Sequence, residues 1–114
     1  MISHCEFWGA KALSGQSASS DPGIYIANDA GGINVDNCNV SFFSDGIDIA
    51  NSSHETFLHT DFFDTNWRYG VHVIGCGNFQ WDGVWAAGNG SDGVHIDPGA
   101  ISIEAYYLIG ENVL

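Results

Sequence analysis

A short pattern recurs along the chain: a glycine, then two aliphatic residues that flank one variable residue. It occurs as Gly23-Ile24-Tyr25-Ile26, Gly46-Ile47-Asp48-Ile49, Gly70-Val71-His72-Val73 and Gly93-Val94-His95-Ile96. The spacing between successive glycines is nearly constant over the four copies. Self-similarity at a fixed spacing of about 20–50 residues is typical of repeat architectures, in which each repeat stacks on the next. We therefore expect a solenoid in which each coil holds one copy.

A second pattern lies between these copies, with mostly apolar residues at relative positions 0, 2, 5 and 7. Copies of it start at Ile33, Thr56, Phe79 and Ile101. Alternation with a period of two indicates a strand with one buried face, and the step of three between the pairs indicates a bend. Asp61 is the one clear misfit, so the local register there could shift and point Phe62 inward.

These patterns predict an all-β fold, a parallel β-helix of about five coils of about 22–24 residues. The 114 residues form one domain (1–114) that we expect to be a segment of a longer solenoid, because neither end shows a capping helix. Residues 10–21, rich in Ser, Ala and Gly, are predicted to form a loop that bulges from the first coil.

The turns between strands are rich in glycine and asparagine. We expect positive φ at the glycines that precede the first strand of each coil, as in Ser44-Asp45-Gly46 and Ser91-Asp92-Gly93. Asn28 and Asn51 follow that strand at equivalent places and predict a short asparagine ladder.

The chain is strongly acidic, with 14 Asp and Glu, 2 Lys and Arg, and a net charge of −12. This balance argues against nucleic acid and against an anionic membrane as partners. An anionic polysaccharide would be repelled unless a cation bridges it, so neutral glycans and cation-dependent binding remain open. No apolar run suits a bilayer span, and no signal peptide is visible. Cys5 and Cys38 are expected to pack in one inward column as small apolar side chains.

Strand alternation places Tyr25, Asp48, His72 and His95 in one outward column. The last three of these would lie about 5 Å apart on successive coils, a spacing that suits a divalent-metal site or an acid/base pair. The alternative is a solvated polar ladder. We assign no metal ligands and expect no cofactor, but leave a divalent cation such as calcium open.

A second outward column collects Asp36, His59, Asp82 and Glu104. Asp82 and Glu104, on adjacent coils, would approach the roughly 5–5.5 Å of a retaining glycosidase pair, and Asp36 and Asp82 the roughly 6.5–9.5 Å of an inverting pair. Candidate catalytic residues are therefore Asp48, Asp82 and Glu104, and the alternative is that these are ordinary surface acids. Arg68 is either a lyase base or substrate anchor, or a turn residue paired with nearby acids.

An aromatic column runs beside the acids and contains Phe62, Trp85 and Tyr107, after Asn39. Large aromatic side chains on an outward face usually mark a contact surface. Three interpretations remain open: a subunit interface, a platform for sugar rings, and packing under a loop. With Asp36, His59, His72 and His95, these aromatic residues form the predicted ligand or interface set.

The repeat resembles the right-handed parallel β-helix of the pectate-lyase-like superfamily. The resemblance rests on the strands that begin at Gly23, Gly46, Gly70 and Gly93, and on Ile33-Asn-Val-Asp-Asn-Cys38, which looks like the superfamily's "V-x-I-x-N-C-x-F" coil. It implies polysaccharide lyases, glycoside hydrolases and bacteriophage tail spikes, of which a tail-spike segment is the most similar. A tail spike implies a homotrimer, a host surface polysaccharide as ligand, and a place on the virion tail or outside the cell.

Three functional hypotheses follow. The first is a tail-spike-like segment that supports trimer assembly and binds host surface polysaccharide. The second is a fragment of a lyase or glycoside hydrolase, and the third is a structural spacer in a shaft. Because the chain is far shorter than a full catalytic β-helix, we favour a non-catalytic role for it.

Overall fold

The computed structural model describes residues 1–9, 21–27, 32–50, 56–74, 79–98, 103–106 and 109–110. All the regular elements in these residues are β-strands. No helix in the described ranges is long and apolar enough to cross a bilayer. Most of the predicted loop at 10–21, the predicted Asn28–Asn51 ladder and Tyr107 fall outside these ranges.

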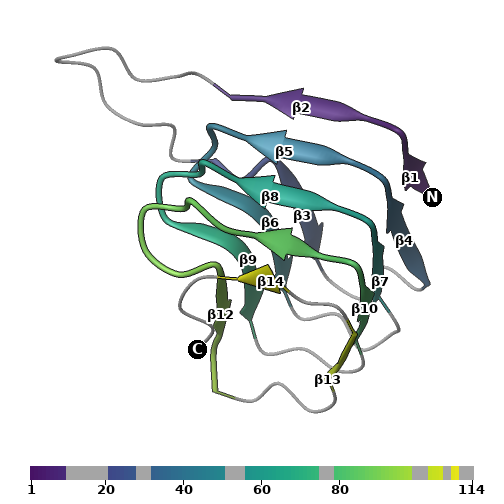
Figure 1. Ribbon diagram of the computed structural model, residues 1–114. Helices are drawn as coiled ribbons and strands as arrows, with labels where there is room; N and C mark the ends of the chain where they lie inside the picture. Colours follow the sequence, from purple (N-terminus) through teal and green to yellow (C-terminus); the bar gives the residue numbers. More distant parts are fainter. Residues whose placement is uncertain are drawn as a thin grey trace, which may run out of the picture.

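The strands form three sheets in which every neighbouring pair is parallel (Figure 1). Sheet 1 contains β1 (Ile2–Ser3), β4 (Ile33–Asp36), β7 (Thr56–His59), β10 (Phe79–Asp82) and β13 (Ile103–Tyr106). Sheet 2 contains β2 (Glu6–Trp8), β5 (Asn39–Ser41), β8 (Phe62–Asp64), β11 (Trp85–Ala86) and β14 (Ile109–Gly110). Sheet 3 contains β3 (Ile24–Ala27), β6 (Asp45–Ala50), β9 (Tyr69–Ile74) and β12 (Val94–Ile96).

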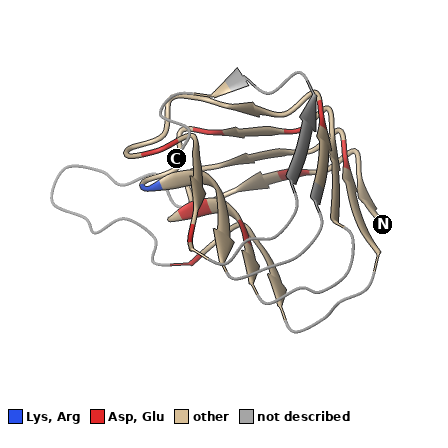
Figure 2. Ribbon diagram, turned by 90° about the horizontal axis from the view of Figure 1, so that it is seen from below, with Lys and Arg blue, Asp and Glu red and all other residues tan. Residues whose placement is uncertain are grey.

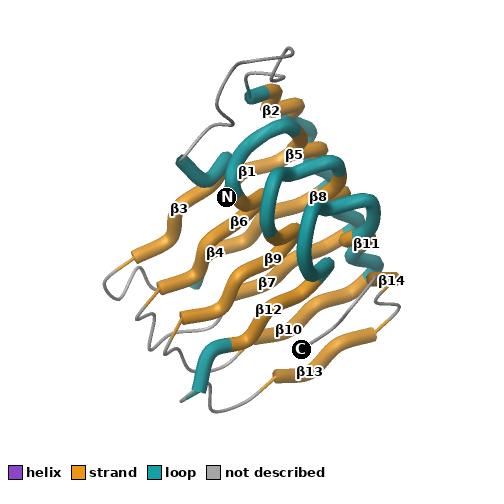
Figure 3. The backbone as a smooth tube through the Cα atoms, turned by 90° about the vertical axis from the view of Figure 1, so that its left-hand side faces the viewer, coloured by secondary structure: helices purple, strands orange, loops and turns teal. Residues whose placement is uncertain are grey.

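The first four coils each contribute one strand to each sheet in turn, and β13 and β14 begin a fifth, which makes the molecule a parallel β-helix. Figure 3 shows the turns that lead from sheet 2 to sheet 3 stacked above one another along the helix axis. Val35 pairs with Leu58, and Phe79 with Ile103, so paired residues in neighbouring strands are one repeat apart in the sequence. The predicted fold class is confirmed, and so is the coil length except in the first coil, which holds the predicted loop and pairs Ile2 with Val35.

The interior is filled by the side chains that the alternating patterns place inward. Val35, Val40, Leu58, Phe63 and Val71 are fully buried. Because successive coils present equivalent residues, each inward side chain packs on its counterparts above and below. Hydrophobic burial is thus spread along the whole described helix, and the column that holds Cys5 and Cys38 belongs to it.

Asp61 keeps its inward position, so the suggested register shift that would turn Phe62 inward is wrong. Its side chain is fully buried, and its two carboxylate oxygens accept hydrogen bonds from the backbone amides of Cys38 (2.8 Å) and His59 (3.0 Å). These amides lie at the bend between sheets 1 and 2, where strand pairing breaks and a buried N–H needs another acceptor. Burial raises the pKa of Asp61 to about 6. Phe62 is exposed instead.

The glycines of the repeat serve close packing rather than positive φ. Among the described glycines, only Gly32, Gly83 and Gly88 have positive φ, which corrects the expectation for Gly46. A Cβ at Gly46 would lie 2.6 Å from the carbonyl oxygen of Gly70 on the next coil. A Cβ at Gly70 would likewise lie 2.6 Å from the carbonyl oxygen of Gly93.

An asparagine ladder occurs in the turns from sheet 2 to sheet 3. The sequence patterns did not predict a ladder at this position. Asn66 is 2% exposed, and its Nδ2 donates to the carbonyl of Val40 (3.2 Å) and to Asn89 Oδ1 (3.1 Å). Asn89 Nδ2 donates in turn to the carbonyl of Phe63 (2.9 Å). The signal was present in the sequence, because the two asparagines occupy equivalent positions in successive repeats.

Candidate metal centre

Sheet 3 aligns the predicted column of polar residues in register. Tyr25 pairs with Asp48, Asp48 with His72, and His72 with His95. The column is not solvated throughout: Asp48 and His72 are each only 8% exposed, whereas Tyr25 is 63% exposed. The alternative of a solvated polar ladder is therefore wrong for its two central members.

An aromatic ring covers this part of the column. Tyr69, at the start of β9, stacks on the ring of His95 at a centroid distance of 4.4 Å and an interplanar angle of 7°. Its centroid also lies 4.9 Å from that of His72. The guanidinium of Arg68 lies over the ring of Tyr69, 4.8 Å from its centroid. Arg68 and Tyr69 thereby shield the histidines from solvent.

Carboxylates approach both nitrogens of His72. Its Nδ1 lies 3.6 Å from Asp48 Oδ1 and 3.7 Å from Asp45 Oδ2, and its Nε2 lies 3.5 Å from Asp97 Oδ1. The same Asp97 oxygen lies 3.3 Å from His95 Nε2. We call Asp45, Asp48, His72, Asp92, His95 and Asp97 the histidine cluster.

Asp92 completes the cluster by orienting His95. Its Oδ2 lies 2.9 Å from His95 Nδ1, within hydrogen-bond distance. If His95 carries its proton on Nδ1 and donates to Asp92, the lone pair of Nε2 faces Asp97. A carboxylate that fixes one ring nitrogen in this way is the usual partner of a metal-binding histidine.

Asp45 and Asp48 are adjacent carboxyl groups whose pKa values are shifted in opposite directions. Burial opposes the ionisation of Asp45, but hydrogen bonds from Arg68, Asp48 and the Tyr69 amide outweigh it and lower the pKa of Asp45. Burial, and then the hydrogen bond with Asp45 and its charge, raise the pKa of Asp48 to about 7. Arg68 pairs with Asp45 through Nε (2.9 Å) and Nη2, which confirms the interpretation of Arg68 as a turn residue paired with an acid.

Two buried atoms of the cluster, His72 Nδ1 and Asp48 Oδ1, have no hydrogen-bond partner among the described residues. They face each other at 3.6 Å. A buried polar atom without a partner is costly, and most such atoms in folded proteins are satisfied by protein, water or an ion. A cation between a lone pair of His72 and the carboxylate oxygen would satisfy both atoms.

The donor atoms fit a transition metal better than calcium. Potential ligand atoms of His72, His95 and Asp97 lie within 4.8 Å of one another, and so do those of Asp45, Asp48 and His72. Imidazole nitrogens with carboxylate oxygens suit copper, zinc or nickel, whereas Ca²⁺ takes about 6–8 oxygen ligands. The sequence predicted Asp48, His72 and His95 as neighbours but missed three members of the cluster.

The positions of the three missed residues, Asp45, Asp92 and Asp97, in the repeat could have pointed to the site. Asp45 and Asp92 precede the repeat glycines and were interpreted as turn residues only. Asp97 follows His95 by two residues, so a strand places both side chains on one face. What the sequence could not show is that these three carboxylates converge on the same two rings.

The predicted acid column on sheet 1 is correct for three of its four members. Asp36 pairs with His59, and His59 with Asp82. Asp82 is then paired with Tyr106, and Glu104 with Gln80, so Asp82 and Glu104 are not the predicted neighbours. The last coil takes up two more residues before β13 than the apolar pattern suggested, and this shifts Glu104 along the sheet. The distance argument for a retaining pair at Asp82 and Glu104 is therefore lost.

The aromatic column is present on sheet 2. Phe62 and Trp85 pair in register, are 42% and 41% exposed, and stack at a centroid distance of 6.3 Å. The next residue in the column is Ile109 rather than the predicted Tyr107, because of the same register shift in the last coil. Phe62 and Trp85 thus form an outward apolar surface on two successive coils.

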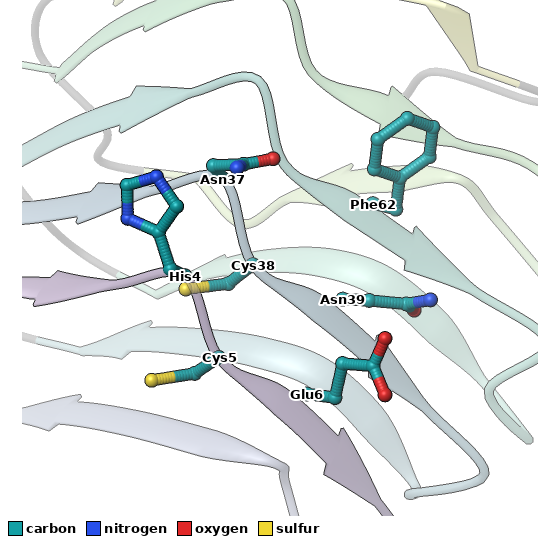
Figure 4. A pocket seen from close by; sticks show the side chains of 7 residues that line it. All are labelled: His4, Cys5, Glu6, Asn37, Cys38, Asn39 and Phe62. Atoms are coloured by element: carbon teal, nitrogen blue, oxygen red, sulfur yellow. The ribbon is translucent and has the colours of Figure 1, made fainter.

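A pocket of about 340 Å³ lies at the bend between sheets 1 and 2 (Figure 4). It is lined by His4, Cys5, Glu6, Asn37, Cys38, Asn39 and Phe62. Both thiols are free, and burial raises the pKa of the Cys38 thiol. Since the thiolate is the form that binds metals, this environment favours an inert packing cysteine.

Acidic residues are spread along the described part of the chain, whereas basic residues occur in one place only (red and blue in Figure 2). Arg68 is the one Lys or Arg in the described part of the chain. Because it is engaged by Asp45, the histidine cluster has little further positive charge nearby to offset its carboxylates.

The fold and the aligned side chains define a parallel β-helix protein with a cluster of histidines and carboxylates. Residues 2–101 match the model of a family described as "Periplasmic copper-binding protein (NosD)". The chain therefore belongs to the NosD family. No curated protein and no solved structure matches it, so the comparisons give no support to a tail spike.

Proposed function

We propose that this chain binds a divalent transition metal at the histidine cluster, and that copper, which the family's description names, is the ion. The observation that carries the proposal is the approach of His72 Nε2 and His95 Nε2 to one oxygen of Asp97, at 3.5 and 3.3 Å. His72, His95 and Asp97 supply a mixed nitrogen and oxygen donor set there.

The cluster suits a cation in charge as well as in geometry. Three carboxylates, Asp45, Asp48 and Asp97, approach His72, while Arg68 offsets the charge of Asp45 alone. At a site of nitrogen and oxygen donors, Cu²⁺ binds more tightly than the other divalent ions of the first transition row. The net charge of −12 adds a long-range attraction for cations, strongest at low salt.

The roles of the residues follow from their contacts. His72, His95 and Asp97 would hold the ion, and Asp92 would keep His95 oriented through its Nδ1. Tyr69 and Arg68 would exclude water from the site by covering the rings. Copper bound there would supply a Lewis-acid and one-electron redox centre. A periplasmic location, taken from the family's description, would expose the site to metal outside the cytoplasm.

A direct test compares Cu²⁺ binding by the metal-free protein and its variants in isothermal titration calorimetry. We expect His72→Ala and His95→Ala each to weaken Cu²⁺ binding by at least about tenfold, because each removes a ligand. His59→Ala is the matched control, since His59 is a partly buried histidine on sheet 1, outside the cluster. Equal affinities in all four proteins would refute the proposal.

A second candidate function is glycan binding by an oligomer of a tail-spike-like kind, and the exposed Phe62–Trp85 pair favours it. Aromatic rings on successive coils can stack on sugar rings or bury against a second subunit. Light scattering on the wild type and Trp85→Ala separates these outcomes from a monomer. A trimer that dissociates in the variant supports assembly, and a monomer without affinity for a glycan panel removes this candidate.

The other sequence-based hypotheses keep the status of proposals. A polysaccharide-cleaving role would now rest on Asp48, or on Asp36 and Asp82 around His59, because Asp82 and Glu104 are not paired. Cleavage of a glycan that is lost in Asp82→Asn would support it. A segment of a longer solenoid, acting as a spacer, would show neither metal binding nor glycan binding.

A further inference from the structure

His72 is the residue shared by the two groups of potential ligands on sheet 3, and it faces them with opposite edges of its ring. Nδ1 is directed at Asp45 and Asp48, and Nε2 at Asp97, which also contacts His95. One imidazole therefore lies between two sets of donors, each of which contains further ligand atoms within 4.8 Å.

We propose that the histidine cluster binds two divalent transition-metal ions, with the His72 ring as a bridge between them. The inner ion would be held by Asp45, Asp48 and His72 Nδ1, and the outer ion by His72 Nε2, His95 and Asp97. The inference rests on the function proposed above and extends it from one ion to two.

The inner half is a buried, prearranged set of oxygen donors. Asp45 is fully buried and Asp48 is 8% exposed. Asp45 Oδ1 accepts hydrogen bonds from Arg68 Nε (2.9 Å) and the Tyr69 amide (3.1 Å), and these fix the carboxylate with Oδ2 toward His72. Oδ2 also accepts a hydrogen bond from Arg68 Nη2, so an ion would use its second lone pair. Asp48 Oδ1 accepts no hydrogen bond from the part of the chain that the structure describes.

The side chain of His72 is a nine-tenths buried group aimed into this inner half. Its exposed fraction is 10%, and its Nδ1 makes no hydrogen bond with any described residue. A histidine in such a place usually donates one ring N–H to a carboxylate or carbonyl, which fixes its tautomer. Distances of 3.6 and 3.7 Å to Asp48 and Asp45 are longer than a hydrogen bond but leave room for an ion between the atoms.

The outer half has its own orienting partner, so it does not depend on the inner one. Asp92 lies 2.9 Å from His95 Nδ1, which directs Nε2 of that ring toward Asp97. Asp97 lies 3.5 Å from His72 Nε2, on the far edge of the bridging ring from Asp48. To coordinate through both nitrogens, His72 releases its remaining ring proton to solvent, and two divalent ions offset the resulting charge.

The number of ions bound distinguishes this inference from the simpler proposal. Metal-free protein is loaded with excess Cu²⁺, freed of unbound metal by gel filtration, and analysed for copper per chain by mass spectrometry. We expect two ions in the wild type, one in Asp48→Asn, which disables the inner half, and one in His95→Ala, which disables the outer half. His59→Ala should retain two.

A spectroscopic readout tests the bridge itself. Two Cu²⁺ ions on one imidazole ring couple magnetically, so the fully loaded wild type should give less paramagnetic resonance signal than its copper content requires. The Asp48→Asn variant, with one ion, should recover the full signal per copper. Circular dichroism confirms that each variant is folded, and Asp48→Ser replaces Asp48→Asn if the latter fails to fold.

The outcomes distinguish two bound ions from a single metal site. One copper per wild-type chain, with His95→Ala binding none and Asp48→Asn still binding one, would overturn the two-ion inference and leave the single metal site intact. No copper on the wild type would overturn both. Two coppers with a full, uncoupled signal would overturn the bridge.

Discussion

His72 and His95 lie on adjacent coils of sheet 3 with ring centroids 5.4 Å apart and ring planes at 62° to each other. The Nε2 atoms of both rings approach the same oxygen of Asp97, at 3.5 and 3.3 Å. Strand pairing alone would stack two such side chains with solvent around them. Here Tyr69 stacks on one ring and contacts the other, so the pair is held in a sheltered place.

Copper should stabilise the folded protein through this pair. A ligand that binds the native state alone stabilises it by about 2.7 kcal/mol at a hundred times its dissociation constant. We therefore expect the melting temperature of the metal-free protein to rise when Cu²⁺ is added, and the rise to be absent in His72→Ala. Differential scanning calorimetry measures the effect, and an equal rise in His72→Ala would show that copper binds elsewhere.

Replacing Arg68, whose guanidinium pairs with Asp45, should destabilise the fold. In Arg68→Met, the fully buried Asp45 carboxylate loses its bidentate partner. Breaking a buried pair costs about 3–5 kcal/mol, but the Arg68 side chain is 50% exposed, so we expect about 1–2 kcal/mol. Urea unfolding measures the loss. Arg68→Lys, which keeps the charge without the forked geometry, should recover part of it, and no loss in either variant would contradict the assignment.

Stability should fall as the pH rises through the range in which Asp61 ionises. Its folded-state pKa of about 6 exceeds the ordinary value, so the folded state binds the proton more tightly than the unfolded state. The resulting stability is complete below about pH 4, is lost between about pH 4 and 6, and amounts to on the order of 3 kcal/mol.

The control for this pH dependence is Asp61→Asn, which cannot ionise. Other titrating groups near Asp61, chiefly His59 and Asp36, are retained in the variant, so the difference between the two proteins isolates Asp61. When the pH is raised from 4.5 to 7.5, the urea concentration at the unfolding midpoint should fall by less in Asp61→Asn than in the wild type. Parallel losses would show that Asp61 does not contribute.

The repeat glycine Gly70 should not tolerate a side chain. In Gly70→Ala, the new Cβ would meet the carbonyl oxygens of Gly93 at 2.6 Å and of Phe63 at 2.7 Å, both parts of the backbone. Neither can move without opening the stack of coils, so we expect a loss of several kcal/mol or failure to fold. Gly83→Asn is the contrasting change, because asparagine tolerates the positive φ there and the nearest atom to its Cβ is 3.4 Å away. Equal losses in the two variants, measured by urea unfolding, would contradict this account.

The asparagine ladder should contribute strongly to stability. Asn66→Ala leaves the buried carbonyl of Val40 and the amide of Phe43 without their partner. Each unsatisfied buried group costs about 1–3 kcal/mol, so a loss of about 3 kcal/mol in the free energy of unfolding is expected. Gln80→Ala, a partly buried amide on β10, is the control and should change stability little. A neutral Asn66→Ala would mean that the turn rearranges.

The sequence by itself determined the solenoid, its coil length and the stacking of equivalent residues. A repeat of nearly constant length leaves a strand few choices of partner, and alternation decides which face is inward. The columns that contain Asp48, His72 and His95, and Phe62 and Trp85, therefore follow from counting residues.

The tertiary structure decided what the counting could not. A turn can absorb residues without disturbing the apolar pattern, and this moved Glu104 away from Asp82. A buried bend can require a carboxylate, which kept Asp61 inward against its polarity. The convergence of Asp45 and Asp97 on His72 depends on where the start of β6 and the end of β12 lie relative to β9, and contacts of that kind are set by three-dimensional packing rather than by any spacing in the chain.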